Sequence, residues 1–449
     1  MHQSIDSTLE EPPDVIESTQ FIAPRWLMWV SIAGIAAIFG YLLVYHYHHE
    51  SRDDGHLGDF KTFYQAAELA RNHGDIYTAG PPRQKYVYPP LIAFLYTPLT
   101  ALPRLQAARV MLFLTAAMML GSFLLAARAV GVRLGVGGIT TSIFIALLIS
   151  LLNENEMRNQ LTMLETDALM LLMFTLALYW LDRFPVMAGL ALALAFNIKY
   201  LAIVTLPYLL LRRRWKAAGS LVIGSLFFAI LPAVLLGWRE DLRCLHVAFG
   251  GLLKWFHVAP AAGYAVEVHD IGDTLSLSIT SSLAHLLTPR GYSDFAVMLS
   301  AACVGVISLG VVAGMYAING FSLWLMPENR DSDRAGLAGL VALEWAGLVT
   351  VAVVFSPNTN TRHLLLVPII NVVGLVIVLM PRPARSRLPA IAGLVLILLS
   401  LIMLPKNFRP HYFRYGITCW GILVGYLLIL WSGLRNIRSG PAVQPLRGD

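Results

Sequence analysis

Asp59 stands out among the residues that could do chemistry, because it directly precedes a helix-forming stretch in a loop between two long apolar segments. A carboxylate held there can accept a proton from a hydroxyl group that attacks a neighbouring electrophile. The same place suits a helix N-cap, whose side-chain oxygen accepts a backbone N–H. Spacing alone favours the cap, since caps are far commoner than catalytic acids. Asp270 and Asp273, in a later loop, are second candidates for the acid and fit turn or cap residues better.

Lys199 lies in the middle of an apolar stretch at residues 185–211. An ammonium group in such surroundings is costly by about 2 kcal/mol or more and normally has a partner. That partner could be an anionic ligand, or Glu165 or Asp167 in a structural ion pair. The side chain could also extend to the membrane interface. For Lys199, the sequence favours a ligand-binding role and a structural role equally.

Metal and disulfide chemistry find little support in the sequence. The stretch "YHYHHE" at residues 45–50 could hold a metal ion, but a polar face at the membrane interface explains it better. The cysteines lack CxxC spacing, and their odd number leaves at least one thiol unpaired. They are Cys244, Cys303 and Cys419. We expect no metal, no cofactor and no disulfide framework.

Membrane helices must position these residues. Of the 449 residues 57% are hydrophobic and 13% are charged, far below the roughly 25% charged fraction of soluble domains. Residues 185–211 have basic residues near both ends, which predicts two short arms that meet near Asn197 and Lys199. With these arms we expect an all-α polytopic membrane protein of about twelve transmembrane segments. The other apolar segments lie near residues 26–45, 106–127, 137–152, 161–181, 217–236, 295–318, 335–355, 363–380, 388–404 and 415–434.

Basic residues orient the chain, because clusters of arginine between apolar segments mark the cytoplasmic side. The net charge of +6 therefore reports topology, and no nucleic-acid partner is expected. The prediction is a multi-pass protein of the cytoplasmic (inner) membrane whose chemically rich loops face outward. Residues 61–72 form a short amphipathic helix at the membrane surface in this interpretation. The expected parts are a cytoplasmic tail at 1–25, a membrane domain at 26–438 with external loops at 46–104 and 237–293, and a tail at 439–449.

Several short motifs follow one another along the chain. They are "GDF" at 58–60, "YVYPPL" at 86–91, "NQ" at 159–160, the stretch around Lys199, and "SPNTNTRHLLLVPII" at 356–370. As an ordered set they resemble glycosyltransferase family 87, whose members are membrane glycosyltransferases of the GT-C class that use polyprenyl-phosphate sugars.

The resemblance implies a GT-C-like bundle whose first external loop supplies the general base, by this comparison Asp59. One carboxylate suffices because a phosphate leaving group needs no protonation, whereas a glycoside hydrolase needs a pair. The implied reaction is an inverting single displacement of a hexose, with mannose as first candidate. Cations would stabilise the leaving phosphate, and the candidates are Lys199, Arg362, His363, Arg409, His411 and Arg414. Candidates for a substrate groove are Tyr64, Tyr86, Tyr88 and Gln160.

Each secondary candidate also has a structural role to weigh. Arg362 fits a simple interfacial anchor, His363 a polar residue at a helix start, and the tyrosines an ordinary interfacial belt. The expected partners are the lipid-linked donor, a lipid or glycan acceptor and the bilayer.

A transporter or a flippase of lipid-linked sugars is the main alternative function. Intramembrane charges would then mark a pathway, and the candidates are Glu165, Asp167, Lys199 and Glu344. Transporters commonly have broken helices in matching halves, but only one broken segment is evident here, and the richest polar cluster is in a loop. This favours an enzyme. A sugar-polymer ligase or polymerase on a related scaffold is a third possibility.

Overall fold

The computed structural model describes residues 24–50, 58–81, 85–255, 271–322, 331–357, 359–402 and 409–438. Every regular element within these ranges is a helix, which confirms the all-α class. Most of the polar tail at 1–25, the tail at 439–449 and the candidate acid Asp270 lie outside the described residues.

Six helical segments are long and apolar enough to cross a membrane. They are α1 (Arg25–Glu50), α4 (Arg104–Arg133), α10 (Trp215–Ile230) continued by α11 (Ala233–Leu236), α14 (Asp294–Ile318), α17 (Ala384–Leu401) and α19 (Ile417–Arg438). Shorter apolar helices pack among them: α5 (Ile139–Leu152), α7 (Asp167–Trp180), α8 (Pro185–Ile198), η3 (Tyr200–Val204), α9 (Thr205–Leu211), α15 (Asp331–Val354), η6 (His363–Leu366) and α16 (Pro368–Leu379). The chain is a membrane protein, and the expected number of about twelve segments stays a prediction.

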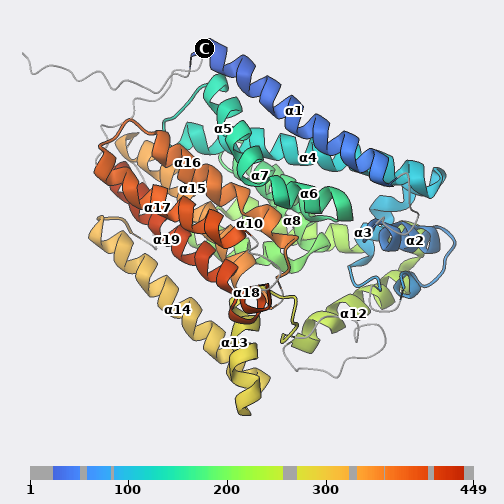
Figure 1. The fold of residues 1–449 in the computed structure, drawn as a ribbon. Helices are drawn as coiled ribbons and strands as arrows, with labels where there is room; N and C mark the ends of the chain where they lie inside the picture. Colours follow the sequence, from blue (N-terminus) through green and yellow to red (C-terminus); the bar gives the residue numbers. More distant parts are fainter. Residues whose placement is uncertain are drawn as a thin grey trace, which may run out of the picture.

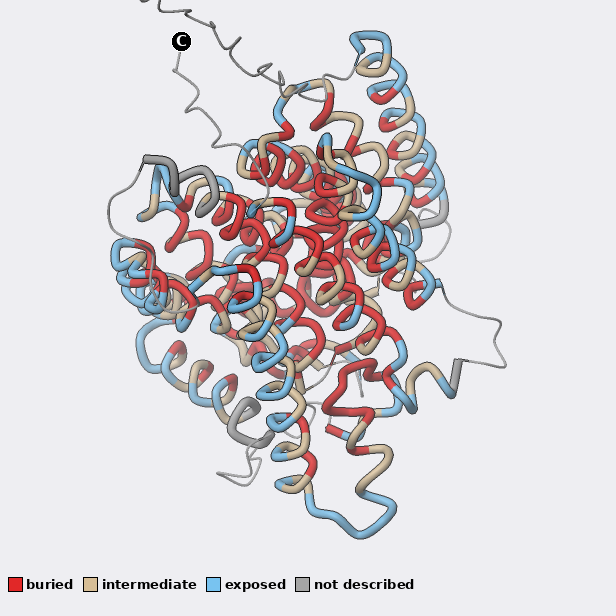
Figure 2. Tube along the Cα trace, turned by 90° about the vertical axis from the view of Figure 1, so that its left-hand side faces the viewer, coloured by how far each residue is buried: buried red, intermediate tan, exposed pale blue. Residues whose placement is uncertain are grey.

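The helices form one bundle with its buried residues concentrated in the middle (Figures 1 and 2). Small residues let the backbones approach closely, as is common between membrane helices. On α17, a Cβ atom at Gly393 would lie 2.5 Å from the carbonyl oxygen of Gly425 on α19. On α8, one at Gly189 would lie 2.3 Å from the carbonyl oxygen of Ala217 on α10. Larger side chains at either glycine would push these helix pairs apart.

The segment 185–211 turns back on itself, as the sequence predicted. The start of α8 contacts the start of α10 through Gly189 and Ala217. Further along both helices, the Asn197 side chain donates a hydrogen bond of 3.1 Å to the carbonyl oxygen of Ser225. The two helices therefore run in the same direction, so η3 and α9 must return the chain to its starting side. The break falls at Lys199, which is extended (φ −140°, ψ 133°).

Residues 153–181 differ from the predicted apolar segments at 137–152 and 161–181, which left only a short connection between them. The polar stretch forms α6 (Glu154–Met163), and α7 begins only at Asp167. Glu154 and Arg158 pair one turn apart at 2.7 Å, which stabilises α6. Leu164 then adopts the left-handed conformation (φ 50°) and its N–H bonds to the carbonyl of Gln160, which ends the helix. This break places Glu165 between two helices.

The first loop, residues 58–103, packs against the bundle as a small helical unit. Its elements are α2 (Phe60–Arg71), η1 (Ile76–Thr78), α3 (Pro90–Tyr96) and η2 (Thr97–Ala101). The apolar face expected for residues 61–72 is buried, with Phe63, Ala66, Ala67 and Ala70 at most 1% exposed. The loop joins α12 (Trp238–Trp255) through a 2.7 Å ion pair of Asp75 with Arg243 and a 2.8 Å hydrogen bond from Tyr77 to the carbonyl of Cys244.

Helices from distant parts of the chain gather with this loop at one end of the bundle, at the right and bottom of Figure 1. They include α12, α13 (Ile279–Leu287) with η5 (Thr288–Arg290), and α18 (Arg409–Tyr415).

Candidate active site

Asp59 and Glu165 share one cation. Nη1 of Arg362 donates a hydrogen bond to Oδ2 of Asp59 and another to Oε1 of Glu165. Asp59 stands at the N-cap position of α2, but its side chain makes no capping hydrogen bond. Its carboxylate is engaged with Arg362 instead, so the cap role that spacing favoured is not the one it plays here.

Burial makes this contact unusual. The side chain of Glu165 is 2% exposed, whereas those of Asp59 and Arg362 are 19% and 25% exposed. Burial, followed by the nearby Asp59 carboxyl, raises the pKa of Glu165 well above its usual value. The site thus contains one accessible carboxylate and one deeply buried carboxyl group, both held on the same guanidinium.

Lys199 forms a second ion pair beside the first. Its Nζ lies 2.8 Å and 2.7 Å from the two carboxylate oxygens of Asp167, the fully buried first residue of α7. The same Nζ lies 5.8 Å from the centre of the Tyr88 ring, within cation–π range. Of the two structural partners considered for Lys199, Asp167 is the one in contact. The break at Lys199 points the ammonium toward the first loop, so it can also meet a ligand there.

His363 and Gln160 complete the surroundings. His363 interacts electrostatically with Lys199 and Asp167, and its Nδ1 is buried with no hydrogen-bond partner among the described residues. The Gln160 amide donates a 2.6 Å hydrogen bond to the backbone carbonyl of Glu165, which fixes the α6–α7 junction. Gln160 is 1% exposed, so its role is to hold the backbone next to the site and not to contact a substrate.

The groove tyrosines divide into two groups. Tyr64 donates a 2.8 Å hydrogen bond to the carbonyl of Leu102, and Tyr86 donates one of 2.6 Å to that of Pro89. Both are at most 5% exposed, so they brace the first loop internally instead of lining an open groove. Tyr88 is half-buried and faces Lys199. Of these three tyrosines, Tyr88 alone lies against the charged cluster. This cluster consists of Asp59, Glu165, Asp167, Lys199 and Arg362.

The remaining candidates lie apart from the cluster. His411 stacks on Tyr415, with 6.2 Å between ring centres, and Arg414 lies over the same ring at 5.8 Å. Both are exposed on α18, and no described contact joins them to Asp59. The side chain of Arg409 lies outside the described residues. Oδ1 of Asp273 accepts a 2.8 Å hydrogen bond from the Leu275 N–H, which is the turn role expected for it.

Sequence reasoning missed the contact between Glu165 and Asp59. It considered Glu165 only as a partner for Lys199 or as a transport residue. The available signal was a pair of acids at residues 165 and 167 directly before a continuous apolar stretch, a position where a charge is expensive unless it is paired.

A match to a protein-family model adds the class of enzyme to the apolar helices of the fold, and the class is a membrane glycosyltransferase. The model of glycosyltransferase family 87 matches residues 86–357, more than half of the chain. The chain therefore belongs to glycosyltransferase family 87. No curated protein and no solved structure shows a significant match to it. The matched range contains Glu165, Asp167 and Lys199 but neither Asp59 nor Arg362, so the roles of those two residues rest on their geometry.

Proposed function

We propose that the protein transfers a hexose, with mannose as first candidate, from a polyprenyl-phosphate donor to an acceptor hydroxyl outside the cytoplasmic membrane. The observation that carries the proposal is the shared contact of Arg362 with Asp59 and Glu165, next to the Lys199–Asp167 pair. Such a site offers one base for a hydroxyl and two cations for a phosphate. Those are the groups that this transfer requires.

The reaction is a single displacement at the anomeric carbon. The acceptor oxygen forms the new glycosidic bond while its proton passes to Asp59. The bond from the anomeric carbon to the phosphate oxygen breaks, and the polyprenyl phosphate leaves with the bonding electrons. Arg362 and Lys199 stabilise the negative charge that develops on this phosphate, and attack from the opposite face inverts the configuration.

Donor binding also prepares the base. Arg362 donates a hydrogen bond to the Asp59 carboxylate. A donor phosphate competes for the same guanidinium, with which it forms strong charge-assisted hydrogen bonds. Once Arg362 turns to the phosphate, this oxygen of Asp59 is free to accept a hydrogen bond from the acceptor hydroxyl. Glu165, buried beneath, keeps Arg362 in place during this exchange.

The proposed function also requires the site to face the outer side of the membrane. With about twelve crossing or half-crossing segments, as expected, and the arginine-rich loops in the cytoplasm, the first loop would lie on the outer side, where a lipid-linked sugar and its acceptor meet. His363 supports the phosphate side of the site through its proximity to Lys199. The buried ion pair of Arg212 with Glu344 also binds the Tyr316 hydroxyl within the helix bundle, which gives those charges a structural role.

Transfer from a panel of labelled donors tests the proposal. The purified protein in lipid nanodiscs is incubated with radiolabelled polyprenyl-phosphate hexoses and, separately, with nucleotide sugars in the presence of membrane lipid extract. We expect label in an extracted lipid or glycan only with a polyprenyl-phosphate sugar, and none with Asp59→Asn. Label from a nucleotide sugar alone would refute the proposed donor.

A further inference from the structure

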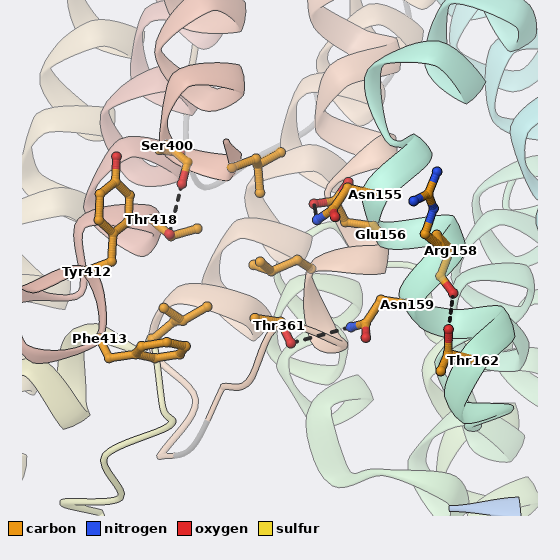
Figure 3. Close-up of a pocket in the computed structure, with 13 residues that line it drawn as sticks. Asn155, Glu156, Arg158, Asn159, Thr162, Thr361, Ser400, Tyr412, Phe413 and Thr418 are labelled. Carbon is orange, nitrogen blue, oxygen red and sulfur yellow. Dashed lines mark hydrogen bonds between the residues drawn. The ribbon is translucent and has the colours of Figure 1, made fainter. Parts of the chain in front are cut away.

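A partly open pocket of about 340 Å³ lies along α6 (Figure 3). Its walls come from α6, the residues before η6, the end of α17, α18 and the start of α19. This volume is at the low end of the roughly 300–1,000 Å³ typical of small-molecule pockets. A site of this size suits one or two sugar rings.

Helix α6 connects the pocket with the surroundings of Asp59. Asn155, Asn159 and Thr162 of α6 line the pocket, and their spacing places them on one helical face. Two further residues of this helix contact segments that belong to the charged cluster. Gln160 bonds to the backbone of Glu165. The backbone of Met163 packs so closely on Gly58 that a Cβ atom there would lie 2.7 Å from the Met163 Cα.

Thr361 connects the pocket to the charged cluster through the backbone. Nδ2 of Asn159 donates a 3.4 Å hydrogen bond to Oγ1 of Thr361, as Figure 3 shows. Thr361 immediately precedes Arg362, the residue that holds Asp59. A ligand hydroxyl that replaces this long, weak hydrogen bond would lie at the border of the charged cluster.

The lining favours an uncharged, hydroxyl-rich ligand over a phosphate. Amide and hydroxyl groups face the pocket beside the rings of Tyr412 and Phe413, which offer apolar faces to a sugar. Glu156, 6% exposed, contributes a carboxyl group that would repel an anion but accepts hydrogen bonds from hydroxyls. Among the described lining residues the one cation is Arg158, which is paired with Glu154 at 2.7 Å.

We propose that this pocket binds the sugar ring of the acceptor, an uncharged hexopyranoside, and presents its hydroxyl to Asp59 past the Asn159–Thr361 contact. This inference rests on the proposed transferase function, since an acceptor site has meaning only for a transferase. It gives the two substrates separate binding places. The donor phosphate meets Arg362 and Lys199, and the acceptor ring occupies the pocket.

Two pocket variants and one matched control test the assignment. Tyr412→Ala removes a ring that lines the pocket, and Asn159→Leu removes the amide at its border. Tyr415→Ala is the control, because Tyr415 lies on the same helix, is exposed and does not line the pocket. Binding of methyl and benzyl hexopyranosides to the protein in nanodiscs is measured by saturation-transfer NMR without any donor. Transfer from the labelled lipid-linked donor is measured in parallel.

We expect the wild type, Tyr415→Ala and Asp59→Asn to bind a glycoside, and both pocket variants to lose the binding signal. In the transfer assay the pocket variants should raise the acceptor KM about tenfold or more and leave the donor KM unchanged. Absence of glycoside binding to the wild type, or equal binding in the pocket variants, would overturn the assignment of this pocket as a sugar-binding site. Glycoside binding without transfer from any lipid-linked donor would instead overturn the acceptor role and the proposed function, and would leave a sugar-binding site.

Discussion

The Arg362 guanidinium joins Asp59 to Glu165 across sequence separations of 303 and 197 residues. The contact brings together the first loop, the α6–α7 junction and the residues before η6. It also places the proposed base in direct contact with the cation that we propose for the donor phosphate. A donor phosphate therefore cannot take Arg362 without changing the surroundings of Asp59, which links donor binding to the readiness of the base.

Asp59→Asn tests the base. A general base contributes on the order of 100- to 10,000-fold to rate, and asparagine keeps the size of the side chain without its basicity. Because Asp59 makes no capping hydrogen bond, the variant should retain the stability of the wild type. Donor affinity should be unchanged or higher, since Arg362 loses a competing carboxylate. Initial rates and donor binding measure both effects.

Asp273→Asn is the matched control for this change. Asparagine can still accept the Leu275 N–H in the turn, so activity should stay normal. Near-normal transfer by Asp59→Asn would assign the base to another residue.

Substitutions of Arg362 separate charge from geometry. Arg362→Gln removes the cation, and because a hydrogen bond to a charged group contributes about 1.5–3 kcal/mol, the donor Kd should rise by at least about tenfold. Arg362→Lys keeps a charge but loses the planar fork that serves two acceptors. Its donor affinity should lie between those of the wild type and Arg362→Gln. Unchanged donor binding in both variants would leave Arg362 as a structural partner of Asp59 and Glu165.

Lys199 has a structural and a functional role that a double substitution can separate. Lys199→Met leaves Asp167 buried without its cation, and breaking such a pair costs roughly 3–5 kcal/mol. We expect low expression and a lowered melting midpoint. Adding Asp167→Asn should restore folding, because the unpaired charge is gone. Donor affinity should remain weak in the double variant. Full recovery of donor binding and transfer there would show that the pair is structural only.

The raised pKa of Glu165 predicts that the stability of the protein depends on pH. This residue lies between α6 and α7, and burial raises its pKa well above the usual 4.5. The native state then holds the proton more tightly than the unfolded state. Stability should therefore fall as the pH rises from about 4.5 through the raised native pKa, and level off above it. Glu165→Gln cannot titrate and should lack this decline.

Melting midpoints of the wild type and Glu165→Gln between pH 4.5 and 8 measure the difference. Taking the difference between the two midpoints at each pH removes the contribution of the other carboxyl groups, because these titrate in both proteins. A wild type that gains stability over the variant as the pH rises would mean that Arg362 holds Glu165 in its charged form.

The sequence predicted local features of the fold better than contacts between distant segments. The apolar face of residues 61–72 and the break at Lys199 were confirmed, because helical periodicity and flanking charge are local signals. The helix α6 was missed, because a polar stretch between apolar segments resembles a turn. Leu164 in the left-handed conformation could not be foreseen, since that conformation is unfavourable for a branched side chain.

The site was predicted in part. Asp59, Lys199, Arg362 and His363 were each proposed from residue type and position, and all four fall in one region of the structure. Their partners were harder to predict, because Arg362, which holds both Glu165 and Asp59, is far from both in sequence. Tyr64 and Tyr86 carried the same aromatic signal as Tyr88, and only packing distinguishes internal rings from the one that faces Lys199.

The orientation of the membrane domain is the last prediction, and every proposed role depends on it. Single cysteines are introduced in a Cys303→Ser background, since Cys303 is exposed while Cys244 and Cys419 are buried. The test sites are exposed residues on opposite sides of the predicted membrane domain, Asn72 and Thr288 on one side and Lys216 and Arg385 on the other. Arginine-rich flanks place the second pair in the cytoplasm.

A membrane-impermeant maleimide applied to intact cells or spheroplasts should label Asn72→Cys and Thr288→Cys. Lys216→Cys and Arg385→Cys should react only after permeabilisation, which also shows that these two thiols are accessible. The reverse pattern would place Asp59 on the cytoplasmic side, where nucleotide sugars are available, and would remove the reason for a lipid-linked donor. Labelling of one residue from each pair would instead mean that the number of crossings between them is wrong, with the return of the chain at Lys199 as the first segment to re-examine.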